Sequence, residues 1–70
     1  VGDILKEYTN SYIAYLIDEY IHSERDRAIL KRRLIDGVLY EALAEEFGLS
    51  VVQTKNIVYK LQNKIFKFLQ

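Results

Sequence analysis

The residues best suited to bind a phosphate lie in the last third of the chain. Residues 49–70 contain no acidic residue and four lysines, which are Lys55, Lys60, Lys64 and Lys67. A lysine ammonium group binds phosphate oxygens as a compact point charge, so this segment has the chemistry of a nucleic-acid contact. The formal net charge of the whole chain is zero, which counts against a nucleic-acid binder. An ordinary solvated helix face also carries lysines, and charge alone leaves both interpretations open.

The side chains that commonly perform catalysis or bind metals form no recognisable pattern. His22 is the only histidine, the chain has no cysteine, and no spacing typical of a zinc site occurs. The serines stand at capping or turn positions, and no glycine-rich loop is present to hold a phosphate. Glu45 and Glu46 are adjacent and point to different sides of a helix, so they do not form an acid/base pair. We therefore expect no enzyme activity, no metal or other cofactor, and no small-molecule substrate.

The lysine-rich segment is predicted to be the second of two helices joined by a tight turn. The apolar residues of the first helix share one face, and they are Leu43, Ala44 and Phe47. Gly48 ends this helix because glycine adopts a positive φ at little cost. Ser50 can cap the following helix by accepting a bond from a free backbone N–H group. Small Ala44 permits a close crossing of the two helices, and this layout from residue 40 to residue 60 is that of a DNA-reading helix-turn-helix.

The second helix of this pair is expected to run without a break from residue 51 to about Phe68. Its predicted inner stripe consists of Thr54, Ile57, Leu61, Ile65 and Phe68, with Val58 beside it. We expect Val51, Val52, Lys55, Asn56 and Tyr59 to point outward. Two apolar sets repeat every seven residues, namely Val51, Val58 and Ile65, and Val52, Tyr59 and Phe66. Either they support a short coiled-coil pairing or, as a small domain favours, the far end of the helix receives the N-terminal helix.

The N-terminal part, residues 1–22, is predicted to form a supporting helix from Asp3 to about His22, or two short helices that break near residues 9–11. Its apolar residues recur at helical spacing, and they are Ile13, Leu16, Ile17, Tyr20 and Ile21. Three tyrosines line one flank of the same helix, and they are Tyr8, Tyr12 and Tyr15. They either cover the edge of the core with their hydroxyl groups in water or form a homodimer or partner contact.

A further helix is predicted between the N-terminal part and the central pair. Ser23 and Asp26 suit its N-terminal cap, and we expect it to run to Asp36 and end at Gly37. Its expected buried side consists of Ala28, Ile29, Leu34 and Ile35. Five basic residues surround the remainder, and they are Arg25, Arg27, Lys31, Arg32 and Arg33. They form either a phosphate-contacting patch or, as composition favours, a solvated face paired with Glu41, Glu45 and Glu46.

Length and composition predict a single all-α domain of four to five helices, residues 1–70, that contains a helix-turn-helix. The chain has 70 residues, half of them apolar, and lacks both proline and cysteine. Helix packing alone must therefore stabilise it. No apolar run is long enough to cross a membrane and no signal peptide is evident, so we expect a cytoplasmic protein without a membrane partner. The first residue is Val1 rather than methionine, which predicts a trimmed chain or a fragment of a longer one.

Several short elements together resemble a known family. They are Glu24-Arg25-Asp26-Arg27, Ile29-Leu30, Arg33, Gly37, Tyr40-Glu41, Ala44-Glu45-Glu46 and Gly48-Leu49-Ser50. With this pattern, residues 20–69 resemble region 4 of sigma-70-type RNA polymerase sigma factors and related phage and bacterial regulators. The output domains of LuxR-type response regulators look similar over the same span, and the resemblance implies membership of the winged-helix-like DNA-binding superfamily. The resemblance implies a sigma region 4-like unit over residues 23–69.

The chain departs from the family pattern at a few positions. Leu39 stands where the family usually has a capping serine or threonine, so we expect the helix that follows it to lack a side-chain cap. Arg32 and Thr54 replace residues that are usually apolar. Val51 and Val52 stand where polar groups are usual, and valine can contact a thymine methyl group or dock onto a protein.

The resemblance implies a transcriptional regulator whose recognition helix, about residues 51–66, enters the major groove of double-stranded DNA. Carried over by position, the base-reading candidates are Val51, Val52, Lys55, Asn56 and Tyr59. The candidates for contacts with the DNA backbone are Arg33, Ser50, Lys60 and Lys64. RNA polymerase is a further partner that the resemblance implies. The alternative is a protein-interaction module of the same fold that binds RNA polymerase or self-associates without reading DNA.

Overall fold

The computed structural model describes residues 8–68, and over this range the chain forms four α-helices. They are α2 (Asn10–Tyr20), α3 (Glu24–Leu34), α4 (Tyr40–Phe47) and α5 (Val51–Phe66). The predicted all-α class is therefore confirmed. The expected helix start at Asp3 and the end of the sigma-like span at residue 69 lie outside the described residues.

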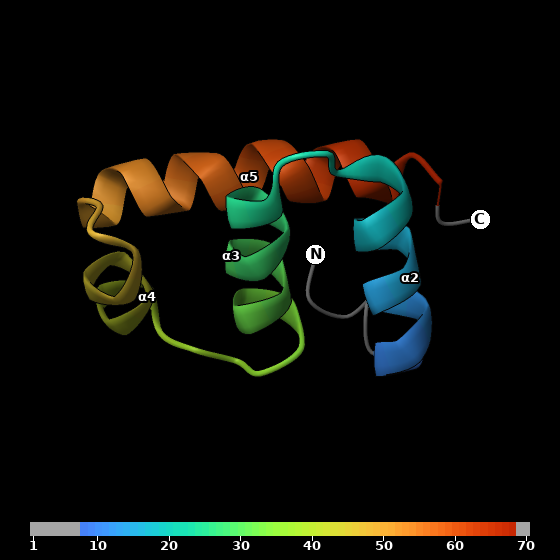
Figure 1. Cartoon of the computed structure of the whole chain (residues 1–70), viewed down its shortest axis with the longest axis horizontal. Helices are drawn as coiled ribbons and strands as arrows, with labels where there is room; N and C mark the ends of the chain where they lie inside the picture. Colours follow the sequence, from blue (N-terminus) through green and yellow to red (C-terminus); the bar gives the residue numbers. More distant parts are fainter. Residues whose placement is uncertain (1–7, 69–70) are drawn as a thin grey trace.

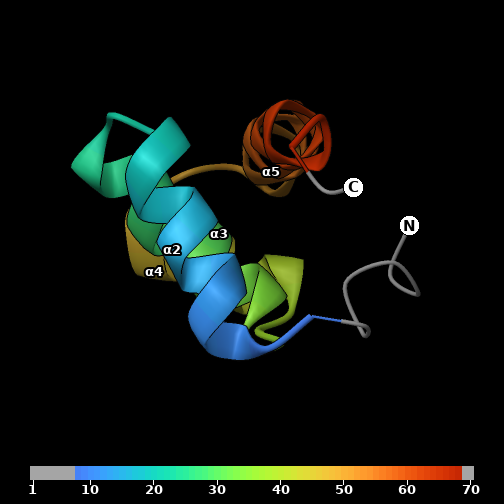
Figure 2. The same ribbon diagram turned by 90° about the vertical axis from the view of Figure 1, so that its right-hand side faces the viewer.

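Helix α5 is the element around which the other helices are arranged. It lies across one side of the molecule, and α2, α3 and α4 stand side by side against it (Figure 1). Figure 2 shows α5 almost end-on, with the three other helices grouped to one side. Helix α5 contacts each of them, and α3 also contacts α2 and α4. One long face of α5 is therefore covered and the opposite face is open to solvent.

The core receives side chains from all four of these helices and from Ile21, the residue that follows α2. Its buried members are Ile13, Leu16, Ile17, Ile21, Ile29, Leu30, Leu43, Val58, Leu61 and Ile65. Burying one such aliphatic side chain contributes about 1.5–3 kcal/mol relative to leaving it in water. Because no disulfide is available to a chain without cysteine, this packing stabilises the fold.

Helix α2 begins where a break was predicted. The Thr9 hydroxyl accepts a hydrogen bond from the backbone N–H of Tyr12 at 3.1 Å, which is a side-chain cap for a helix that starts at Asn10. The polar run at residues 9–11 thus marks a helix start. The helix ends at Tyr20, two residues before the predicted His22.

Helix α3 has the predicted cap but ends earlier than predicted. The Ser23 hydroxyl accepts a bond from the Asp26 backbone N–H at 3.3 Å. The helix stops at Leu34 rather than Asp36, because Gly37 adopts a φ of 71° and the Val38 N–H then turns back to the Arg32 carbonyl at 3.1 Å. Its buried residues are Ile29 and Leu30, whereas Ala28, Leu34 and Ile35 are only half-buried.

The turn between α4 and α5 follows the prediction closely. Gly48 has a φ of 67° in the left-handed region, and the Leu49 N–H bonds the Ala44 carbonyl at 2.8 Å. A Cβ added at Gly48 would meet no atom within 4 Å, so the requirement for glycine there is conformational rather than steric. Ser50 and Gln53 exchange two bonds of 3.0 Å in a capping box at the start of α5. Leu39 precedes α4 without a side-chain cap bond, as its apolar side chain predicted.

The inner stripe of α5 differs from the prediction at Ile57, Val58 and Phe68. Thr54, Leu61 and Ile65 are buried as expected, but Val58 is fully buried and Ile57 only half-buried. The stripe follows the spacing i, i+4, i+7 and i+11, which places Ile57 on its flank. Phe68 is 43% exposed, although its ring stacks on Tyr20 at 3.8 Å between centroids.

The far end of α5 is occupied by α2, as the small size of the domain favoured. Helices α2 and α5 are in contact, and the stack of Tyr20 and Phe68 lies where they meet. Val58 and Ile65 are buried in the core of this chain, so they are not available for the alternative of a coiled-coil seam through Val51, Val58 and Ile65. Among the helices within residues 8–68, none combines the length and apolar character that a membrane span needs.

Candidate nucleic-acid interface

The open face of α5 presents most of the predicted DNA-contacting residues to solvent. Val52, Lys55, Asn56 and Tyr59 are exposed, as are Lys60 and Lys64 on the following turns. Val51 is half-buried beside the turn, so the expectation that it points outward is wrong. The inner face of α5 packs against the other helices, which fixes the backbone from which these side chains project over a helix length of about 24 Å.

The lysines of α5 give this face a positive field. Between residues 8 and 68, no carboxylate lies within 4.0 Å of Lys55, Lys60 or Lys64. The sequence itself places no acid anywhere after Glu46. A positive surface without nearby carboxylates attracts polyanions and remains available to a phosphate.

The ring of Tyr40 connects three helices beside this face. The Arg33 guanidinium of α3 lies over the Tyr40 ring, 4.1 Å from its centroid. On α5, the Lys55 ammonium lies 5.7 Å from the same centroid, and the Tyr59 ring meets Tyr40 edge-on at 6.2 Å. These contacts orient two predicted base-reading side chains. The prediction included Tyr40 only as part of the family pattern, because helical spacing does not reveal contacts between different helices.

Two residues that were predicted to contact phosphates already have partners within the protein. Arg33 donates a hydrogen bond from Nη1 to the Val38 carbonyl at 2.9 Å, in addition to its stacking on Tyr40. Ser50 uses both its hydroxyl and its backbone N–H in the capping box. Both residues therefore stabilise the elements that carry the interface.

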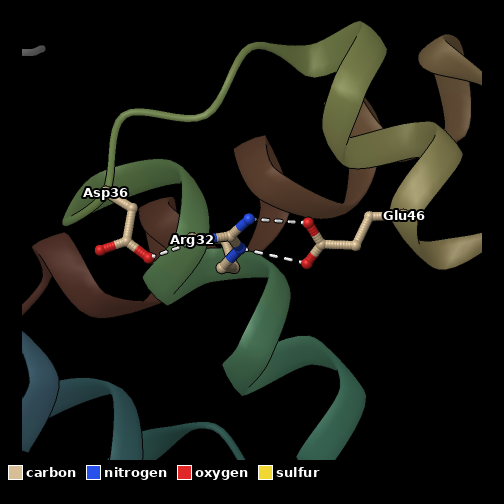
Figure 3. A network of polar contacts seen from close by, with 3 residues as sticks. All are labelled: Arg32, Asp36 and Glu46. Carbon is tan, nitrogen blue, oxygen red and sulfur yellow. Dashed lines mark hydrogen bonds and ion pairs between the residues drawn. The ribbon is translucent and has the colours of Figure 1, made fainter.

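The basic side chains of α3 also have partners in the fold. Arg32 donates Nε and Nη2 to the Glu46 carboxylate at 3.1 and 2.8 Å, and Nη1 to Asp36 at 3.1 Å (Figure 3). Lys31 forms an ion pair with Asp18 at 2.8 Å, and Arg25 forms one with Asp26 at 3.1 Å. Arg27 donates to the carbonyls at the end of α2, those of Ile21 and His22, at 2.9 and 3.1 Å.

These pairings favour the solvated face over the phosphate-contacting patch for the basic run. The solvated face with intramolecular partners is what forms, and Glu46 is one of the predicted partners. Glu41 and Glu45 are not ion-paired to any residue from 8 to 68. Arg32 was expected to belong to the basic run and also departs from the family pattern. Its hydrogen bonds to Glu46 and Asp36 raise its pKa, and the bond from Arg32 lowers the pKa of Glu46.

Thr54, the other departure, is accommodated in the core. Its side chain is fully buried, and its hydroxyl donates a hydrogen bond to the Ser50 carbonyl at 2.9 Å. Over the part of the chain that the structure describes, no buried side-chain nitrogen or oxygen lacks a partner. A threonine therefore occupies this core position without the cost of an unsatisfied hydroxyl, and its bond to Ser50 stabilises the first turn of α5.

The tyrosine flank runs from Tyr8, just before α2, to Tyr15 in the middle of that helix, and the start of α2 points away from α5 (Figures 1 and 2). Tyr8 stacks on Tyr12 and Tyr12 on Tyr15, with centroids 5.5 and 6.4 Å apart. Tyr15 is 56% exposed and Tyr12 38% exposed. Tyr8 packs against the core, so the flank covers the core edge at one end and presents rings to solvent at the other.

Neither a metal site nor a similar protein identifies the function of this surface. In the described range, His, Asp and Glu side chains form no group of three that could hold a metal ion. Comparison of the sequence with protein-family models gave no match, and comparisons with curated proteins and with solved structures gave no significant similarity. The class that the structure defines is a small all-α domain with a polar, basic helix face open to solvent.

Proposed function

We propose that this protein is a sequence-specific DNA-binding regulator of transcription in which α4 and α5 act as a helix-turn-helix. The observation that carries the proposal is the open face of α5, which combines exposed lysines and asparagine with an absence of nearby carboxylates over residues 8–68. A helix of this kind fits the major groove of B-DNA, which is about 12 Å wide. The resemblance of residues 20–69 to sigma factor region 4 supports the same function.

The residues on this face divide into two roles. Asn56 and Tyr59 contact base edges, with Tyr59 oriented by the ring of Tyr40, and Lys55 on the flank of this face contacts a phosphate. Lys60 and Lys64 lie further along α5 and contact phosphates, which sets affinity and register rather than sequence. Arg33 acts through Tyr40 as a positioning residue.

Binding of the whole chain to a pool of random duplexes, followed by fluorescence anisotropy, tests the proposal. We expect binding at low salt that weakens as salt rises, because each neutralised phosphate releases a counterion. The double variant Lys60→Gln, Lys64→Gln should weaken binding to all duplexes alike. Lys31→Gln is the matched control, since Lys31 is paired with Asp18 on another helix. A protein that binds no duplex at low salt, or binds without salt dependence, would overturn the proposal.

A second candidate function is a protein-interaction module that binds RNA polymerase or a second copy of the chain. Two exposed apolar residues favour it, because Leu39 and Val52 are 66% and 67% exposed. The exposed rings of Tyr12 and Tyr15 supply a separate apolar surface. Sedimentation of the purified chain tests self-association, which a monomer at high concentration would exclude. If the chain forms a dimer that persists in the double variant Tyr12→Ser, Tyr15→Ser, the tyrosine flank is excluded as the dimer contact.

A further inference from the structure

The outermost line of side chains on α5 has a simple geometry. Each side chain in this line belongs to a residue two positions before a buried one. Two positions correspond to a rotation of about 200° around the helix, so the line lies opposite the buried stripe. The buried residues are Thr54, Val58, Leu61 and Ile65, and the outer ones, all exposed, are Val52, Asn56, Tyr59 and Asn63. If α5 enters a groove with its open face first, this outer line meets the floor of the groove.

The side chains of this outer line match the major-groove edges of A·T pairs. The side-chain amides of Asn56 and Asn63 can each donate a hydrogen bond to the N7 acceptor of adenine and accept one from its N6 amino group, a pair of partners that only adenine offers in the major groove. The exposed side chain of Val52 and the ring of Tyr59 suit contact with the C5-methyl group of thymine. All four side chains thus find partners on adenine or thymine.

The same helix lacks the side chains that best read G·C pairs. Guanine is read most often by arginine and cytosine by a carboxylate, and α5 contains no arginine, aspartate or glutamate. Lysine can also bond guanine, but Lys55 and Lys60 lie on the two flanks of the outer line. On the flanks of a helix in a groove, lysines face the phosphate strands.

We propose that α5 reads A·T pairs in the major groove, with Asn56 bonding adenine and Val52 contacting the methyl group of a nearby thymine. This inference rests on the proposed DNA-binding function and names its target chemistry. Val52 and Asn56 are separated by about 6 Å along the helix, so their contacts fall on neighbouring base pairs. A run of adjacent A·T pairs is therefore the ligand that fits this part of the face.

Modified bases test the proposal, because they alter the major groove without changing base pairing. The tightest duplex from the random pool is remade with 7-deazaadenine, which lacks the N7 acceptor, or with deoxyuridine, which lacks the thymine methyl group. We expect 7-deazaadenine at one position of the duplex to weaken binding by the wild-type protein about tenfold. The same substitution should leave binding by Asn56→Ala unchanged. Deoxyuridine should weaken binding by the wild-type protein several-fold and binding by Val52→Ala much less. Asn10→Ala, an exposed asparagine on α2, is the matched control and should respond as the wild type does.

The outcomes separate this inference from the function on which it rests. Failure to bind any duplex overturns both. Salt-dependent binding with a preference for G·C pairs, or with none, overturns the A·T inference and leaves DNA binding standing. A preference for A·T pairs that ignores both modified bases also overturns it, because such a preference arises in the minor groove or from DNA shape. Circular dichroism checks that Asn56→Ala and Val52→Ala keep the helical fold.

Discussion

Helices α3 and α5 both carry a cluster of positive charge, and the fold uses the two clusters differently. The basic residues of α3 are bonded to carboxylates, to backbone carbonyls or to an aromatic ring of the same chain. The lysines of α5 face solvent, and within residues 8–68 none has a carboxylate at ion-pair distance. The cluster with the larger charge per residue is thus the one that holds helices together.

This difference shows why the number of charges in a segment does not identify a binding surface. Residues 25–33 contain five basic residues and one acid, which is a denser positive run than α5 has. A phosphate that approached Arg32 would compete with the bidentate pairing to Glu46, whereas Lys60 has no carboxylate at ion-pair distance among residues 8–68. Availability, rather than charge density, is what distinguishes the two helices.

The largest expected effect comes from neutralising each cluster in turn. The triple variant Lys55→Gln, Lys60→Gln, Lys64→Gln loses three phosphate contacts. The plot of the logarithm of the binding constant against the logarithm of the salt concentration should then be less steep by about 2.7, since each contact contributes about 0.9. The matched triple Arg25→Gln, Lys31→Gln, Arg32→Gln on α3 should leave this slope nearly unchanged and lower the melting temperature instead. Anisotropy titrations in a salt series and thermal unfolding measure the two effects. Equal slopes in both triples would abolish the distinction between α3 and α5.

Arg33 is the residue at which the two roles are hardest to separate. Arg33→Ala should reduce the free energy of unfolding by about 1–3 kcal/mol, because it removes the bond to the Val38 carbonyl and the stacking on Tyr40. Arg33→Lys keeps the charge but lacks the planar fork, so it should be destabilised to a similar degree. Urea denaturation measures both. Full recovery of DNA affinity by Arg33→Lys without recovery of stability would instead assign Arg33 to a phosphate contact.

Acid should weaken the link between α3 and α4 in a defined direction. The hydrogen bond from Arg32 lowers the pKa of Glu46 below its usual value of 4.5. The contribution of this pair to stability is therefore complete above the unfolded-state pKa and is lost as the pH falls through the lower folded-state value. The melting temperature of the wild type should exceed that of Glu46→Gln by a constant amount well above pH 4.5 and approach it as the pH falls through the lowered pKa of Glu46. Parallel curves over the whole acid range would show that this pair does not couple the helices.

The smallest effect is expected at the ion pair between Lys31 and Asp18. Both side chains are partly in water, with exposed fractions of 36% for Lys31 and 56% for Asp18. A double-mutant cycle with Lys31→Met and Asp18→Asn should give a coupling energy of about 0.2–0.5 kcal/mol in urea denaturation. A coupling above about 1 kcal/mol would mean that α3 relies on its exposed ion pairs more than on Arg33.

Local features of the fold were accessible from the sequence because each depends on residues close together in the chain. The positive φ of Gly48, the Ser23 and Ser50 caps and the uncapped Leu39 all involve groups within a few residues of one another. The buried positions of α5 were nearly right, and the error between Ile57 and Val58 is a rotation of the stripe by one position. Periodicity fixes that a helix has a buried face but locates its centre only approximately.

The sequence by itself determined an all-α chain, the turn at residues 48–50 and a C-terminal segment with lysines and no acids. The tertiary structure alone decided which positive charges are already bonded and that Tyr40 joins Arg33, Lys55 and Tyr59. The physical reason is that a cap or turn is a local contact, whereas the partner of Arg32 or Arg33 depends on how separate helices pack. That packing is also what leaves one face of α5 open.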